Sequence, residues 1–80
     1  MSLIGETKLE ILKQLDQGPS HGYQLHKDVG VSTPVVYRHL SDLEEAGMVE
    51  STRVDGDNRD KTEYRLTEDG ETLLALLTDD

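Results

Sequence analysis

The chain has 80 residues, of which 17 are acidic and 8 basic, and it contains no cysteine, tryptophan or phenylalanine. This length predicts one domain, residues 1–80, and the lack of cysteine excludes zinc fingers, thiol catalysis and a disulfide framework. The longest apolar runs fall far short of the roughly 20 residues of a membrane span, and no basic-then-apolar leader opens the chain. We therefore expect a soluble cytoplasmic protein without a membrane partner.

The net charge of −9 argues against a nucleic-acid partner, because binding to a polyanion depends on Lys and Arg. The charge is unevenly distributed, however. Residues 20–41 carry Lys27 and Arg38 against Asp28, a net +1, and residues 51–66 carry as many basic as acidic residues. These two segments are where the chain would bind an anion.

Two helices are predicted before residue 31. Apolar residues at helical spacing predict the first from about residue 6 to residue 17, with Thr7 and Glu10 as a capping box. Ser20 is placed to cap a short second helix, whose inner face is expected to be Tyr23 or Leu25, followed by Val29.

A third helix is predicted from about residue 33 to Gly47, capped by Ser32 or Thr33. Its apolar residues recur at i, i+4 and i+7 and form one buried face. They are Val36, Leu40 and Leu43. The opposite side carries Thr33, Tyr37, Arg38 and Ser41.

Two antiparallel strands and a last helix follow. Met48–Val54 and Lys61–Leu66 are rich in Val, Thr and Tyr and flank a run of turn formers, which predicts a half-buried β-hairpin. Thr67 then caps a C-terminal helix with a wide apolar surface, part of which is expected to meet another chain. The fold class is α+β, a winged helix-turn-helix with three helices, a two-stranded β-hairpin wing and a C-terminal helix.

Such a fold suits double-stranded DNA, because an α-helix fills the major groove and a two-stranded ribbon can lie along the backbone. Arg38 is expected to donate bidentate hydrogen bonds to guanine, and His21 is expected to contact a phosphate at the start of the second helix. Contacts from the hairpin would set position and salt dependence more than sequence preference. The predicted DNA-binding residues are His21, Thr33, Tyr37, Arg38, Ser41, Arg53, Asn58, Arg59 and Lys61.

Several segments resemble the PadR family of winged helix-turn-helix repressors. They are Gly18–Leu25 (GPSHGYQL), Val36-Tyr37, Leu43–Val49 (LEEAGMV) and Tyr64–Gly70 (YRLTEDG). The resemblance covers nearly the whole chain and implies a homodimeric transcription regulator whose third helix reads a pseudo-palindromic operator, with Tyr37 at the contact. Small archaeal phage-repressor-like proteins are also similar.

The sequence departs from the PadR pattern in three places. Arg38 stands where the family has a proline, Asp60–Glu63 replaces a basic approach to Tyr64, and the long C-terminal dimerisation region of many members is missing. These departures change which bases are read and weaken a phosphate anchor. They also leave the homodimer interface to the first and last helices.

No cofactor, metal site or enzyme activity is predicted. His21 and His26 lie about 140° apart around a helix, and Asp55-x-Asp57 lacks the later ligands of a calcium loop. Motifs of a nucleophile elbow, a phosphate-binding loop and a zinc protease are absent from the sequence. The alternative to a DNA-binding regulator is a winged-helix module that binds another protein and never DNA. The charge distribution favours DNA, whereas the net charge favours this alternative.

The acidic composition suggests an archaeal halophile with a high-salt cytoplasm. At 1 M salt the Debye length falls to about 3 Å, which screens the repulsion between remote carboxylates and phosphates. We predict that the chain loses helicity in low-salt buffer and regains it in molar KCl, as measured by circular dichroism. Stable folding at about 20 mM salt would contradict this hypothesis.

Overall fold

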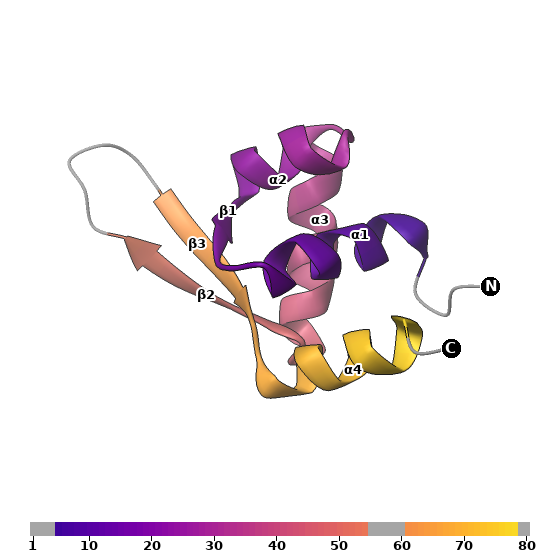
Figure 1. Ribbon diagram of the computed structural model, residues 1–80. Helices are drawn as coiled ribbons and strands as arrows, with labels where there is room; N and C mark the ends of the chain where they lie inside the picture. Colours follow the sequence, from indigo (N-terminus) through magenta and orange to yellow (C-terminus); the bar gives the residue numbers. More distant parts are fainter. Residues whose placement is uncertain (1–4, 55–60, 79–80) are drawn as a thin grey trace.

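The computed structural model describes residues 5–54 and 61–78. The elements in chain order are α1 (Glu6–Asp16), β1 (Ser20–His21), α2 (Gly22–Val29), α3 (Thr33–Glu45), β2 (Val49–Val54), β3 (Lys61–Leu66) and α4 (Glu68–Thr78). Figure 1 shows the β2–β3 hairpin extending away from the helices, while the start of α1 and the end of α4 lie at the opposite end. The expected winged helix-turn-helix is confirmed, with one additional short strand.

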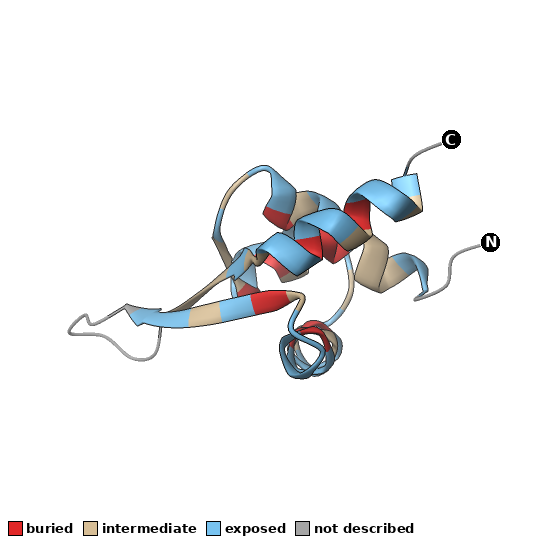
Figure 2. Ribbon diagram, turned by 90° about the horizontal axis from the view of Figure 1, so that it is seen from below, coloured by how far each residue is buried: buried red, intermediate tan, exposed pale blue. Residues whose placement is uncertain are grey.

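The core is one cluster of aliphatic side chains to which all four helices and β2 contribute. Its buried members are Ile11, Leu12, Leu15, Leu25, Val36, Leu40, Leu43, Val49 and Leu74. The predicted stripe of α3 is part of it, and none of its three residues is more than 4% exposed. Figure 2 shows these buried positions facing the centre of the helical part. Because each such side chain stabilises the fold by roughly 1.5–3 kcal/mol, the core determines which side of α3 faces solvent.

The helix starts differ from the sequence-based expectation. α1 begins after Gly5 without any side-chain cap, so the capping box at Thr7 is wrong. Ser20 lies in β1 and does not cap α2, whose N-cap is His21 with an extended backbone. Of the two residues expected on the inner face of α2, Leu25 is fully buried, beside Gly22, whereas Tyr23 is 60% exposed.

The sheet contains a third strand that was not predicted. β1 pairs with β3 through Ser20–Tyr64 and His21–Glu63. β2 pairs with the other edge of β3, so β3 is the central strand. Two residues are too few to show the alternation that marks a strand in a sequence. The start of α2 is therefore attached directly to the wing.

Thr67 caps α4 as predicted. The Gly70 N–H donates to Thr67 Oγ1 at 3.0 Å, and the Thr67 hydroxyl donates to the Gly47 carbonyl at 2.6 Å. Gly70 must lack a side chain, because a Cβ there would collide with the Met48 carbonyl oxygen. These contacts hold the first turn of α4 against the start of β2.

Candidate nucleic-acid interface

The outer face of α3 carries most of the residues predicted to contact bases. Tyr37, Arg38 and Ser41 are all exposed, and Thr33, the first residue of the helix, is half-buried. Ser41 follows Tyr37 by four residues and Arg38 by three, so these side chains share one face. Arg38 forms no hydrogen bond or ion pair with any residue in the described part of the chain. Its guanidinium donors are therefore available to a ligand.

Charge divides α3 into two halves. The N-terminal half carries Arg38, whereas the C-terminal half carries the exposed residues Asp42, Glu44 and Glu45. Lys8 of α1 pairs with Asp42 at 3.4 Å, and the Ser51 hydroxyl of β2 donates to Glu44 at 2.8 Å. Like charges repel, so the acidic half is unsuited to lie against phosphates. Only the first turns of α3 suit the groove of a duplex.

Tyr37 reaches from α3 toward the start of α2. A Cβ placed on Gly22 would lie 2.5 Å from both Cε1 and Cζ of Tyr37, so the ring lies directly against this glycine. Burial raises the pKa of Tyr64 above its ordinary value of 10.0, and the nearby Tyr37 and Glu44 raise it further. Tyr37, Glu44 and Tyr64 thus lie close together where α3 meets the wing.

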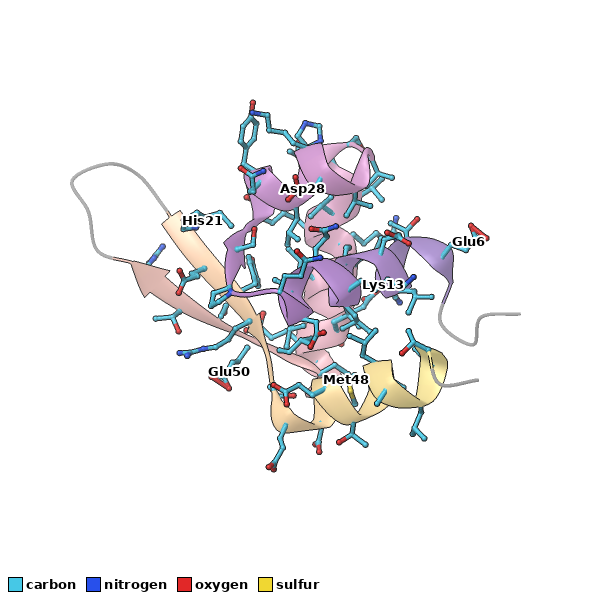
Figure 3. The ribbon with its side chains drawn as sticks, viewed as in Figure 1. Glu6, Lys13, His21, Asp28, Met48 and Glu50 are labelled. Carbon is cyan, nitrogen blue, oxygen red and sulfur yellow. The ribbon has the colours of Figure 1, made fainter. Side chains whose placement is uncertain are left out.

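The structure describes only some of the residues predicted to contact DNA from the wing and the start of α2. His21 is half-buried beside β3, with its Nδ1 atom 3.3 Å from the Thr62 carbonyl oxygen (Figure 3). Arg53 is exposed on β2. The backbone of Lys61 pairs with that of Val54. The side chain of Lys61, and Asn58 and Arg59 as a whole, lie outside the described residues.

Four residues at the junction of α3 and the wing were not among the predicted site residues. They are Gly22, Glu44, Ser51 and Tyr64. No local pattern in the sequence joins Glu44 to Ser51 or Gly22 to Tyr37. Only the assembled fold brings these pairs together.

Metal ligands do not converge in residues 5–54 and 61–78, where no three His, Cys, Asp or Glu side chains could hold one ion. The Nδ1 atom of His26 lies against the Val31 carbonyl oxygen within the same helix-turn segment. Within those same ranges no helix is long and apolar enough to cross a membrane.

Comparison with known proteins identifies the family. Residues 5–51 match the arsR family of bacterial regulatory proteins. The chain belongs to this family. An uncharacterized HTH-type transcriptional regulator of Methanocaldococcus jannaschii is 39% identical over 67 residues, which are 84% of this chain and 70% of that protein. The chain is thus a transcriptional regulator of the helix-turn-helix type, and its relatives are regulators and not enzymes.

Solved structures of other regulators share the fold. A MarR-family transcriptional regulator of Enterococcus faecalis has a TM-score of 0.85 and 26% identity, over 95% of this arsR-family chain and 69% of that one. Bacillus subtilis PadR, solved with operator DNA, has a TM-score of 0.83 and 22% identity, over 91% of this chain and 46% of PadR. The PadR resemblance therefore holds for the fold, while the matching family is arsR.

The raised pKa of Tyr64 provides a test of this junction. Glu44→Gln removes a negative charge that raises this pKa, and it keeps an acceptor for Ser51. We expect the pKa of Tyr64 to fall but to stay above 10.0, because burial is the largest cause and persists. Titration of the tyrosine ring carbons by NMR measures the change.

Glu45→Gln is the matched control, because it removes the same charge from the next exposed residue. It should leave the pKa of Tyr64 unchanged, and an equal fall in both variants would contradict the geometry. Since the pKa is raised in the folded state, the contribution of Tyr64 to stability is complete below pH 10 and is lost as the pH rises further.

Proposed function

We propose that this chain is a sequence-specific regulator that binds double-stranded DNA in the cytoplasm and acts as a repressor. The exposed first half of α3 carries the proposal, because Arg38 stands there with its donors unpaired by the described residues. A guanidinium fork matches the O6 and N7 acceptors of guanine in the major groove. The match to the arsR family supports the regulatory role.

The proposed contacts divide by role. Arg38 reads guanine, while Thr33, Tyr37 and Ser41 contact bases or phosphates beside it. His21 faces the backbone where α2 begins, at the positive end of the helix dipole. The proposed wing contacts to phosphate are Arg53, Asn58, Arg59 and Lys61.

A homodimer joined through α1 and α4 is part of the proposal. Leu76 of α4 is 71% exposed, and the half-buried Leu73 and Leu77 lie on the same helix. The start of α1 and the end of α4 lie opposite the wing, so two copies joined there would both present α3 and the wing outward (Figure 1). A pseudo-palindromic operator would match this symmetry.

A high-salt archaeal cell would reconcile DNA binding with the net charge of −9. The archaeal relative supports an archaeal source. The whole chain, residues 1–80, is proposed to act as a single DNA-binding domain.

The alternative function is a winged helix that binds another protein. The acidic second half of α3 favours it, because Asp42, Glu44 and Glu45 are exposed beside the predicted groove face. A basic protein surface would accept these carboxylates, whereas DNA would not.

Variants of Arg38 separate base reading from charge attraction. We expect Arg38→Ala to weaken operator binding by ~1–3 kcal/mol and to relax the preference for guanine at one base pair. Arg38→Lys keeps the charge and loses the planar fork, so it should retain affinity for random-sequence DNA but lose this preference. Mobility-shift titration against the chain's own upstream region and against random-sequence DNA measures both.

Arg53→Ala on the wing is the comparison variant. It should weaken binding to all sequences alike and flatten the dependence of affinity on salt, because a phosphate contact carries no sequence information. Binding that is identical for the native protein and all three variants, or absent on every duplex, would favour the protein-binding alternative.

Leu76→Glu tests the homodimer. We expect this variant to sediment as a folded monomer at concentrations where the native chain is dimeric, because a buried unpaired charge is strongly disfavoured at an apolar interface. Ala75→Glu adds the same charge at the neighbouring exposed position and should remain dimeric. Analytical ultracentrifugation measures the mass, and a native chain that is monomeric at every concentration would exclude the dimer.

A further inference from the structure

We propose that Gly22 is a positioning residue for DNA binding, which holds the ring of Tyr37 between α3 and the wing so that both meet DNA at a fixed angle. The inference deepens the proposed function and rests on it. It assigns a role to a residue with no side chain, at the start of α2.

The contact between Gly22 and Tyr37 leaves no room for a larger residue. A Cβ on the buried Gly22 would lie 2.5 Å from Cε1 and Cζ of Tyr37 and 2.6 Å from its hydroxyl oxygen. The φ angle of Gly22 is not positive, unlike those of four other glycines in the described chain. The sign of φ at this position therefore does not require glycine, whereas the tyrosine ring does.

This contact joins α3 to the wing through β1. Gly22 directly follows β1, in which Ser20 pairs with Tyr64 of the central strand β3. The ring of Tyr37 thus rests on the residue that connects α2 to the sheet. Displacing the ring would remove this link between the N-terminal half of α3 and the sheet, while Val36 and Leu40 stay in the core.

A second contact joins α3 to the other side of the sheet. Ser51 of β2 also pairs with Tyr64, and its hydroxyl donates to Glu44 of α3 at 2.8 Å. Tyr37 and Glu44 are seven residues apart, so the helix is held at two heights about two turns apart. These two contacts add to the core packing of α3 against Val49 of β2 in setting the angle between helix and wing.

Loss of the first attachment should leave the fold intact. Tyr37 is 45% exposed and its ring is the far end of a side chain outside the buried cluster, so a methyl group at position 22 would push the ring outward. Operator DNA must touch α3 and the wing together. The affinity for operator DNA should therefore depend on the angle between α3 and the wing more strongly than the affinity for random-sequence DNA does.

A double-mutant cycle with Gly22→Ala and Tyr37→Ala tests the proposal. We expect Gly22→Ala alone to weaken operator binding about tenfold and to change binding in the Tyr37→Ala background less than about twofold. In that background it should raise the melting temperature, because alanine restricts the unfolded chain. Tyr37→Phe keeps the ring, so Gly22→Ala should keep its full effect there.

Two further measurements separate this inference from the proposed function. Hydroxyl-radical footprinting should show that Gly22→Ala loses protection at the wing flank and keeps it at the base pair that Arg38 contacts. NMR titration without DNA should show a lower pKa of Tyr64 in Gly22→Ala, since the electrostatic effect of the displaced Tyr37 on Tyr64 is weaker.

Additive effects in the cycle, or native operator affinity in Gly22→Ala, would overturn the positioning role and leave the proposed function standing. An unchanged pKa of Tyr64 in Gly22→Ala would overturn the ring contact itself, whether or not DNA binds. Failure of the native chain to bind any duplex would refute the proposed function instead.

Discussion

Burial of one stripe of α3 orients the rest of the molecule. Val36, Leu40 and Leu43 join the core cluster with at most 4% exposure, in company with residues of α1, α2, β2 and α4. Because successive helical residues turn by about 100°, this burial directs Tyr37, Arg38 and Ser41 to solvent. A rotation of α3 that buried Arg38 would expose the stripe and lose several kcal/mol, at roughly 1.5–3 kcal/mol for each side chain. The core packing thus fixes which positions of α3 face solvent, but it does not restrict which residue types occupy them.

Much of the acidity of the chain lies on elements that need not face DNA, although the wing strands also carry Glu50 and Glu63. The second half of α3 holds Asp42, Glu44 and Glu45, and Lys8 and Ser51 engage the first two locally. The first turn of α4 carries three more carboxylates, on the helix proposed to join two copies. A duplex that meets the first turns of α3 and the wing avoids most of this charge. The net charge is therefore a poor guide to the surface that matters, in keeping with the segment charges of the sequence.

Long periodic patterns made most of the fold predictable. The α3 stripe, the β2–β3 hairpin and the Thr67 cap follow from spacing and residue type over several turns or residue pairs. The errors fall on the starts of α1 and α2 and on the short strand β1, which takes Ser20 from its expected capping role because pairing with Tyr64 overrides a local preference. The junction of α3 with the wing was not predictable, since Gly22 and Tyr37 meet only when α2 and α3 cross. The exposed site residues of α3 could be predicted from one face of the helix. The contacts of Tyr37 with Gly22 and of Glu44 with Ser51 could not.

The short strand β1 has a consequence for the shape of the DNA that this chain would accept. β1 is hydrogen-bonded to β3 and runs without a break into α2, so no free joint separates the wing from the helix pair. A duplex whose grooves do not match this rigid frame must itself bend or untwist, and the elastic energy of that distortion depends on base sequence. The sequence of base pairs that no side chain touches would then affect affinity, because it sets the stiffness of the duplex.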